Sequence, residues 1–444
     1  MTYQEAIGYL DSFINYERKE IHDYKQAFKL EHMARFVQLL NDPHINIKSI
    51  HIAGTKGKGS TAAFIHSILK THGFKTGLYT SPHLISLCER IRVGDELISE
   101  EDVGRLVGEI KRTVDILPDD EKPTFFELYT ALAFLYFKEK EVDFAVYEVG
   151  MGGRLDATNI VRPLVCAITP ISHDHTKNLG SSLAEIAFEK AGIIKEDSIC
   201  VISPQEKEAL DVIESAGRSK NARLLKIGFD IRFEEVAFDD TKEIFNIYGI
   251  LGDYPCCKSG LLGEHQIINA VTAVGVIEAL SYFGIEIPED TIKKGLALTK
   301  WPGRLELGKR DPLIFLDGAH NRASARALAK TIRERMGLKD PLLILGISKD
   351  KDIKGIVEEL EPISKYIILT RSNVPDRAED PAQIKKFIKS KEAVITENLS
   401  EALKEAQSKV SGKEAILITG SLFLVGEAKK MFNQVESTRL NQPG

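Results

Sequence analysis

The chain has 444 residues, of which 43% are hydrophobic and 28% are charged, and its formal net charge is −6. This length favours two domains, and the composition excludes a disordered or fibrous protein. The slightly acidic balance argues against nucleic acid as a partner. The sequence shows neither an apolar run long enough to cross a bilayer nor a basic leader followed by an apolar one. We therefore expect a cytoplasmic protein with no membrane partner.

The cysteine pattern is typical of a reducing compartment. The five cysteines are odd in number and include no C-x-x-C pair. This argues against a disulfide framework and against a zinc ribbon. The cysteines are Cys88, Cys166, Cys200, Cys256 and Cys257.

Apolar spacing predicts helices at the N-terminus, and a candidate phosphate-binding loop follows them. A strand-like run ends at Ala53, the segment Gly54–Ser60 carries three glycines and two lysines, and helical spacing resumes at Phe64. A strand that turns through glycines into a helix directs backbone N–H groups and the positive end of the helix dipole at one point. That geometry binds phosphate. Lys58 would add a mobile charge and Ser60 a hydroxyl group for Mg²⁺.

This loop differs from the standard Walker A pattern. Gly59 separates Lys58 from Ser60, and Ile52 stands where the earlier glycine belongs. A glycine-rich turn with solvated lysines is therefore an alternative explanation. Nucleotide binding is the favoured interpretation, because strand, glycine turn and helix follow in the order that phosphate binding requires.

Polar side chains follow three further strand-like runs. These are residues 76–79 before Thr80-Ser81-Pro82-His83, residues 143–147 before Glu148, and residues 164–169 before Ser172-His173-Asp174-His175. Ligands of open parallel sheets bind outside the carboxyl ends of the strands. Glu148, which precedes a glycine loop, is therefore expected to bind a metal ion or water. The two histidines near a turn are weak candidates by themselves, since such residues are more often structural.

The polar residues at these strand ends suit Mg²⁺. This ion takes few protein ligands and keeps nucleotide phosphates and waters in its other positions. The hydroxyl group of Ser81, the carboxylate of Glu148 and the imidazole of His175 match that role. Zinc would need more histidine or cysteine at tighter spacing, so it is disfavoured.

Two predicted helices carry residues with competing explanations. Thr124 and Glu127 form a capping-box pattern before a long apolar helix that runs to about Phe137, and capping alone accounts for both polar residues. The predicted helix 181–191 carries Lys190 near its end, where an ordinary surface lysine is the alternative to a functional one. Residues 99–116 are a further capped helix.

The chain becomes regular from about residue 311. Five strand-like runs, each followed by a helix-like segment, predict a compact doubly wound domain. The runs are residues 313–317, 342–346, 366–370, 392–395 and 415–419. We therefore expect an α/β fold with an N-terminal P-loop ATPase-type domain on a mostly parallel sheet (1–300) and a smaller C-terminal Rossmann-like domain (301–444). A loose tail is expected from Glu436.

Nine short motifs follow one another in order between Gly54 and Leu424. They are Gly54-Thr-Lys-Gly-Lys-Gly-Ser60, Tyr79-Thr-Ser-Pro-His83, Glu148-Val-Gly-Met-Gly-Gly-Arg-Leu-Asp-Ala-Thr-Asn159, Asp174-His175, Glu189-Lys-Ala-Gly-Ile-Ile-Lys195, His265-Gln266 with Asn269-Ala270, Trp301-Pro-Gly-Arg304, Leu316-Asp-Gly-Ala-His-Asn321 and Thr419-Gly-Ser-Leu-Phe-Leu424. Each motif is weak alone. Together they resemble the folylpolyglutamate synthase and dihydrofolate synthase family, which belongs with the Mur ligases.

The resemblance implies an ATP-dependent amide ligase. In that family ATP phosphorylates the terminal carboxylate of a pterin substrate, the amine of L-glutamate attacks the acyl phosphate, and ADP and phosphate leave. The strand-end residues agree with this chemistry, because phosphoryl transfer asks the protein mainly for positioning and charge neutralisation. A second domain that closes over the site would exclude water from the acyl phosphate.

The resemblance also implies roles for individual residues. The expected nucleotide contacts are Thr55, Lys56, Gly57, Lys58, Gly59, Ser60, Asn269, Arg304 and Asp317. The expected Mg²⁺ ligands are Ser81, Glu148 and His175, with Ser60 near the metal and Lys190 carbamylated to hold a second Mg²⁺. Lys58, Glu148, His175 and Lys190 are the catalytic set.

The expected pterin contacts are Thr124, Phe126, Glu127, Leu155, Asp156 and Ala157, and the expected glutamate contacts are His320 and Ser421. The segment Arg154-Leu155-Asp156 is similar to that of bifunctional members, which accept dihydropteroate and folates. We therefore favour a bifunctional monomer whose substrates are ATP, L-glutamate and dihydropteroate or folate. The alternatives are another Mur-type amino-acid ligase and a P-loop nucleotide-binding protein without ligase chemistry.

Overall fold

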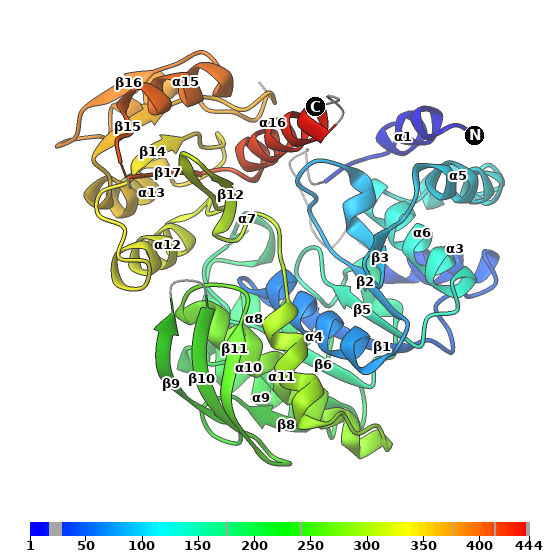
Figure 1. Ribbon diagram of the computed structural model, residues 1–444. Coiled ribbons are helices and arrows are strands. Elements are labelled where there is room, and N and C mark those ends of the chain that lie inside the picture. Colours follow the sequence, from blue (N-terminus) through cyan, green and yellow to red (C-terminus); the bar gives the residue numbers. More distant parts are fainter. Residues whose placement is uncertain (17–28, 175, 240–241, 375, 413, 441–444) are drawn as a thin grey trace.

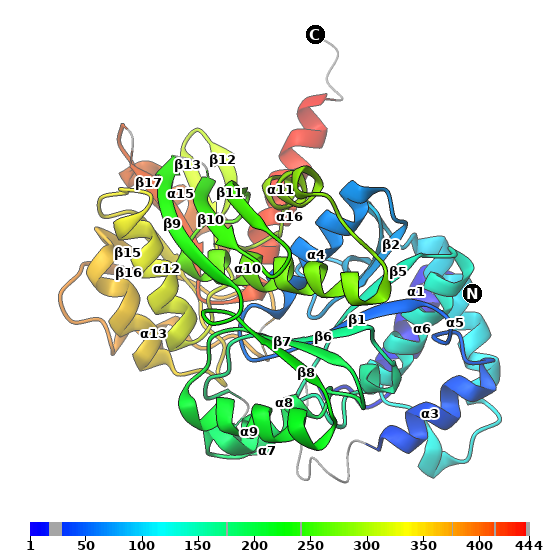
Figure 2. The same ribbon diagram turned by 90° about the horizontal axis from the view of Figure 1, so that it is seen from below.

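A computed structural model describes the chain except for residues 17–28, 175, 240–241, 375, 413 and 441–444 (Figure 1). Within that part, two mainly parallel sheets follow one another along the chain, and a three-stranded antiparallel sheet lies between them in sequence. Helices pack on both parallel sheets (Figures 1 and 2). The expected α/β fold class is confirmed.

The first sheet has eight strands in the order β4-β3-β2-β5-β1-β6-β7-β8. The strands are β1 (Lys48–Ala53), β2 (Thr76–Tyr79), β3 (Ile91–Val93), β4 (Glu96–Leu97), β5 (Phe144–Glu148), β6 (Val165–Ile168), β7 (Ile199–Ile202) and β8 (Arg223–Lys226). All pairings from β2 through β8 are parallel, whereas β3 and β4 extend the β2 edge as antiparallel strands. Because β1 pairs with both β5 and β6, the carboxyl ends of these three strands are adjacent.

Alternation along each strand divides the core between two faces of this sheet. Val165 and Ala167 belong to the core cluster that includes residues of α4, α10 and α11, whereas Cys166 and Ile168 belong to the cluster that includes residues of α8 and α9. Figure 2 shows α4 and α10 on one side of the sheet and α8 and α9 on the other. The helices of this part are α1 (Tyr3–Asp11), α3 (Leu30–Leu39), α4 (Lys58–His72), α5 (Glu100–Val114), α6 (Phe125–Glu139), α7 (Thr176–Leu179), α8 (Leu183–Ala191), α9 (Lys207–Ser219), α10 (Glu264–Ala279) and α11 (Glu289–Leu298). The sheet is therefore covered on both sides, as a parallel sheet requires.

The antiparallel sheet was not expected as a unit. It has the order β11-β10-β9, with β9 (Arg232–Asp239), β10 (Lys242–Tyr248) and β11 (Asp253–Ser259). It packs on α10 and α11. Among the described residues, Glu264–Phe283 is the one helical stretch long and apolar enough to cross a membrane, but 78% of its apolar window is buried inside the molecule. Its apolar character is explained by its place in the core.

The second sheet has the strand order β12-β13-β17-β14-β15-β16. The expected five strand–helix units are confirmed, and β12 (Glu306–Arg310) adds an antiparallel edge. The units are β13 (Leu313–Leu316) with α12 (Arg322–Glu334), β14 (Leu342–Leu345) with α13 (Ile353–Leu360), β15 (Tyr366–Leu369) with α14 (Pro381–Lys385), β16 (Ala393–Ile395) with α15 (Leu399–Lys409) and β17 (Ala415–Thr419) with α16 (Leu422–Leu440). The prediction that a loose tail begins at Glu436 is wrong, because α16 continues to Leu440.

Candidate active site

The glycine loop lies against the end of β6. A Cβ at Gly54, where φ is +147°, would stand 1.8 Å from Thr169 Oγ1, so a larger residue does not fit. The backbone N–H groups of Thr55 and Lys56 both donate to Pro170 O, at 3.1 and 3.2 Å. The strand end and these hydrogen bonds hold the loop in one conformation.

The N-terminal end of α4 is covered by α10 and by the connector that leads to the second sheet. Gly57 caps α4 with φ +84°, and a Cβ there would lie 2.2 Å from Asn269 Oδ1. A Cβ at Gly59 would lie 3.2 Å from the Trp301 ring. Ser60, in the first turn of α4, is buried. The structure thus brings the predicted Asn269 to the glycine loop, 212 residues away from Gly57 in sequence.

Two lysine ammonium groups meet at one carbonyl of this loop. Gly54 O accepts from Lys58 Nζ at 3.2 Å and from Lys190 Nζ at 2.9 Å. Lys190 is buried, and burial together with the Lys58 cation lowers its pKa to about 7. Lys56 pairs with Asp174 at 3.1 Å. Converging cations beside a helix N-terminus favour an anion, and a triphosphate supplies one.

Glu148 ends β5 next to this loop. It pairs in register with Ile52 of β1, and its Oε2 accepts from Ser81 N at 3.2 Å. Burial raises the pKa of Glu148, while the Lys58 ammonium group opposes that shift. Among the described residues, Ser81 N–H is the one hydrogen-bond donor to this carboxylate, so other lone pairs are available to a cation. The oxygen donors of Glu148 and Ser81 match the preference of Mg²⁺.

The third predicted magnesium ligand, His175, lies outside the described residues. Its neighbour Asp174 forms the ion pair with Lys56, which shows that this segment approaches the glycine loop. Thr55 Oγ1 also donates to Ser172 O at 3.2 Å. No cluster of three or more histidine, cysteine or acidic residues occurs in the described part of the chain, from which His175 is missing.

The predicted pterin residues of α6 lie at its N-terminal end. Thr124 and Glu127 form the expected capping box, with Glu127 Oε2 accepting from Thr124 N at 2.7 Å and from Thr124 Oγ1 at 2.8 Å. Burial raises the pKa of Glu127. Phe126 is half-buried beside Gly150, where an added Cβ would lie 2.6 Å from the ring. The structure thus places Phe126 next to the loop that follows β5.

Asp156 organises that loop. Its carboxylate accepts hydrogen bonds from Gly150 N, Met151 N and Thr158 N, each at 3.0 Å, and from Thr158 Oγ1 at 2.5 Å. The Thr158 hydroxyl in turn contacts His51 Nε2 at 2.8 Å. The carboxylate is therefore turned into the protein. Leu155 and Ala157 flank it on the loop, half-buried and buried respectively.

The second sheet contributes a further group of polar residues. Asp317 follows β13 and accepts from Leu305 N at 2.8 Å and Ala319 N at 2.9 Å. Burial raises its pKa, and the Arg304 cation opposes the shift. His320 Nδ1 contacts Gly318 O at 2.7 Å, and burial lowers the pKa of His320 to about 4.

The two groups of polar residues lie within electrostatic reach of each other. The Arg304 cation opposes the raised pKa of Glu148, and the Lys56 cation contributes to the lowered pKa of His320. Ser421 follows β17 and is buried, with its hydroxyl accepting from Phe423 N at 3.2 Å. The carboxyl ends of both sheets therefore contribute residues to one candidate site.

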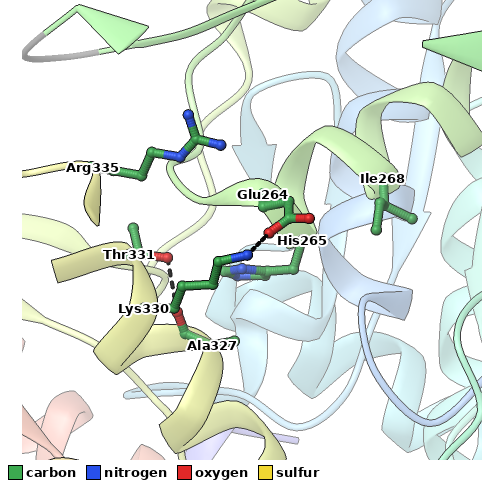
Figure 3. Close-up of a pocket in the computed structure, with 7 residues that line it drawn as sticks. All are labelled: Glu264, His265, Ile268, Ala327, Lys330, Thr331 and Arg335. Carbon is green, nitrogen blue, oxygen red and sulfur yellow. Dashed lines mark hydrogen bonds and ion pairs between the residues drawn. The ribbon is translucent and has the colours of Figure 1, made fainter. Parts of the chain in front are cut away.

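A cavity of about 210 Å³ separates α10 from α12 (Figure 3). Its lining residues are Glu264, His265, Ile268, Ala327, Lys330, Thr331 and Arg335. Lys330 pairs with Glu264 across the cavity, and Arg335 pairs with Glu235 and approaches Glu243 at 4.0 Å. No local motif in the sequence marks these ion pairs, because their partners lie 66 to 100 residues apart.

Comparisons with known proteins agree with this geometry. The family model of the Mur ligase middle domain matches residues 52–277, and that of the Mur ligase glutamate ligase domain matches residues 303–422. Fold and site together define an ATP-dependent ligase with Mur ligase architecture. These two matches argue against the alternative of a nucleotide-binding protein without ligase chemistry.

Individual relatives narrow the assignment. The dihydrofolate synthase/folylpolyglutamate synthase of Bacillus subtilis (strain 168) is 36% identical over 406 residues, which cover 90% of this chain and 94% of the relative. The enzyme of the same name from Mycobacterium tuberculosis is 34% identical, covering 91% and 90%. The structure of Mycobacterium tuberculosis folylpolyglutamate synthase complexed with ADP has a TM-score of 0.86 at 33% identity and covers 97% of this chain and 98% of that one. The chain belongs to the folylpolyglutamate synthase and dihydrofolate synthase family.

Proposed function

We propose that this ligase adds L-glutamate both to dihydropteroate and to folates, with ATP as co-substrate. The observation that carries the proposal is the convergence of Lys58, Lys190 and Glu148 on the glycine loop at one edge of the first sheet. Arg304, in the connector, and His320, after β13, lie within electrostatic reach of that edge. This arrangement suits the joining of two anionic substrates through a phosphate.

The reaction has two steps. A carboxylate oxygen of the pterin substrate attacks the γ-phosphorus of ATP, and the bond to the ADP oxygen breaks. The amine of glutamate then attacks the acyl carbon, the bond to phosphate breaks, and the nitrogen loses a proton. Phosphoryl transfer needs positioning and charge neutralisation above all, and the backbone N–H groups of residues 55–60 with Lys58 would supply both.

Mg²⁺ would be held by Ser81, Glu148 and His175, with Ser60 near the metal and the nucleotide. The ion would supply charge neutralisation on the phosphates. The lone pairs of Glu148 described above support this assignment. Asn269, Arg304 and Asp317 are proposed nucleotide contacts, with Thr55, Lys56, Gly57 and Gly59 in the loop itself.

For the pterin we propose contacts by Thr124, Phe126, Glu127, Leu155, Asp156 and Ala157. Phe126 offers a ring face next to the loop after β5, which suits stacking on a pterin. The carboxylate of Asp156 would act by holding that loop. The Bacillus subtilis relative carries both activities in its name, and a structural neighbour with a TM-score of 0.84 and 27% identity is an FPGS–AMPPCP–folate complex. His320 and Ser421 are proposed to handle glutamate.

We also propose that Lys190 becomes carbamylated and holds a second Mg²⁺. The ammonium group would first lose one proton. The uncharged amine would then attack CO₂, forming an N–C bond and releasing a second proton, so that an oxygen-donor anion replaces the cation. Burial of Lys190 against Gly54 O and beside Lys58 supports this, because a buried ammonium group next to a second cation is costly. Lys190→Ala should lose turnover and regain it with short carboxylic acids; an unaffected variant would exclude the carbamate.

The function is tested by phosphate release from ATP with dihydropteroate or tetrahydrofolate in parallel. We expect release to require glutamate and either pterin. Release without a pterin, or release that requires a cell-wall nucleotide, would refute the folate proposal. Glu148→Gln should abolish release while circular dichroism remains that of the wild type, and near-wild-type release would remove Glu148 from the metal site.

Further parts of the proposal concern the whole chain. We propose a division into domains 1–300 and 301–444, supported by the two sheets with separate hydrophobic cores. We also propose a cytoplasmic monomer without nucleic-acid or membrane partners. Light scattering of the purified protein would test the monomer, and a dimer at micromolar concentration would contradict it.

A further inference from the structure

The loop after β5 and the end of α8 are in direct backbone contact. A Cβ at Gly153 would lie 2.8 Å from Glu189 O, and a Cβ at Gly192 would lie 2.3 Å from Arg154 Cβ. Arg154 N–H donates to Glu189 O at 2.7 Å. The two glycines therefore allow an approach of the two segments that other residues would prevent.

Side chains reinforce this contact. Arg154 Nε donates to both carboxylate oxygens of Glu189, at 3.3 and 3.2 Å, and Arg154 Nη2 donates to Oε1 at 2.8 Å. The Glu189 side chain is 8% exposed and that of Arg154 is 33% exposed. The guanidinium group also lies 5.5 Å from the ring centre of Phe188. Bidentate, charge-assisted hydrogen bonds of this kind fix geometry as well as adding stability.

A second connection joins the same two segments. Asn159 Nδ2 donates to Arg154 O at 3.0 Å and to Gly192 O at 3.1 Å. Lys195 Nζ donates to Asn159 O and Oδ1, both at 2.7 Å. The loop from Arg154 to Asn159 is thus attached at its first residue to Glu189, and at its last residue to Gly192 and Lys195.

The last turn of α8 therefore holds two loops at once. Glu189 and Lys190 are consecutive, yet Glu189 binds the loop that carries Leu155, and Lys190 donates to Gly54 O of the glycine loop. One helical turn sets the distance between these two loops. A rigid spacer is needed wherever two reacting groups must be held at a fixed separation.

We propose that Arg154 and Glu189 are positioning residues. They hold the loop after β5, here called the substrate loop, at a fixed position relative to the phosphate-binding loop Gly54–Ser60. This inference rests on the proposed function, since it takes the loop after β5 as a pterin contact. Neither side chain transfers a proton or forms a bond. Their ion pair would keep the pterin carboxylate at transfer distance from the γ-phosphate of ATP.

The test compares Arg154→Met, Glu189→Gln and the double variant in steady-state kinetics with each substrate varied in turn. For Arg154→Met we expect kcat/KM for the pterin to fall on the order of 100-fold, because a displacement of about 1 Å has that effect on positioned reactants. The KM for ATP should stay at the wild-type value. Glu189→Gln should show the same selective loss in smaller degree, because a neutral hydrogen bond remains.

Arg218→Met is the matched control, because Arg218 forms an exposed ion pair on α9 at 3.7 Å from Glu214. It should have wild-type kinetics. The double variant should be no worse than Arg154→Met, since both changes break one pair. Losses that add, a raised KM for ATP, or a loss of rate that only follows a fall in Tm would overturn the proposal. If the wild type itself did not join glutamate to either pterin, the proposed function would fail instead.

Discussion

Gly57 is the position where one added methyl group tests the phosphate-binding loop most directly. It caps α4 with φ +84°, and an added Cβ would lie 2.2 Å from Asn269 Oδ1. Gly73 caps the other end of the same helix with φ +108°, but an added Cβ there would point into open space. Comparing Gly57→Ala with Gly73→Ala therefore separates backbone strain from the contact with Asn269.

The structure gives the size of each effect. A residue with a Cβ in the left-handed region costs about 1–2 kcal/mol, and both variants share that cost. In Gly57→Ala the side chain of Asn269 must also turn away, which breaks its 2.9 Å hydrogen bond to Gln266. Leaving a buried amide unpaired costs a further 1–3 kcal/mol, roughly. We expect losses of unfolding free energy of about 1–2 kcal/mol for Gly73→Ala and about 2–5 kcal/mol for Gly57→Ala.

Urea denaturation measures these losses, and isothermal titration with Mg²⁺ and ATP measures nucleotide affinity. Only Gly57→Ala should weaken ATP binding, because its strain is relieved when the loop leaves the conformation that faces phosphate. Gly73→Ala should bind ATP like the wild type. If Gly57→Ala matched Gly73→Ala in stability and bound ATP normally, the assignment of this loop as the phosphate site would be refuted.

Three further predictions concern other parts of the molecule. Burial lowers the pKa of His66 from 6.5 to about 4, so the unfolded chain binds a proton that the folded chain excludes, and stability should fall as the pH falls from 6.5 to 4. In denaturation experiments at different pH, His66→Gln should reduce the fall of the unfolding free energy by up to about 3 kcal/mol. An unchanged dependence of the unfolding free energy on pH would contradict this. Arg335→Met should cost about 1–3 kcal/mol by leaving the buried Glu243 carboxylate without its cation, and adding Glu243→Gln should restore most of the urea midpoint. Asp156→Asn should weaken pterin binding in titrations but leave ATP affinity unchanged, since its four hydrogen bonds hold the substrate loop.

Local patterns in the sequence predicted most of the fold. Each strand–helix unit of the second sheet is a short buried run followed by a helix, so neighbouring residues alone specify it. The glycine loop of Gly54–Ser60 could be identified in the same way, because its phosphate-binding geometry arises within one strand, turn and helix. The antiparallel β9–β11 sheet was missed as a unit, since its alternating, partly exposed strands give a weak signal.

Local sequence patterns did not predict how the residues of the candidate site are arranged in space. The sequence offered Glu148 as a polar residue at a strand end, but the pairing of β1 with both β5 and β6 decides that it lies beside the glycine loop. It also offered Asp156 as a substrate contact, and the structure turns that carboxylate towards the backbone of its own loop. Side-chain direction depends on hydrogen-bond partners that spacing alone does not reveal.

The sequence by itself determined the chemical inventory: the glycine loop, the polar strand ends and the ordered motifs of a glutamate ligase family. Only the tertiary structure decided which groups act on each other. Lys190 reaches Gly54 O across 136 residues, and Glu189 meets Arg154 across 35. Such contacts arise when distant segments pack on a shared core. Gly153 and Gly192 have no side chain, and this lets the loop after β5 touch the end of α8.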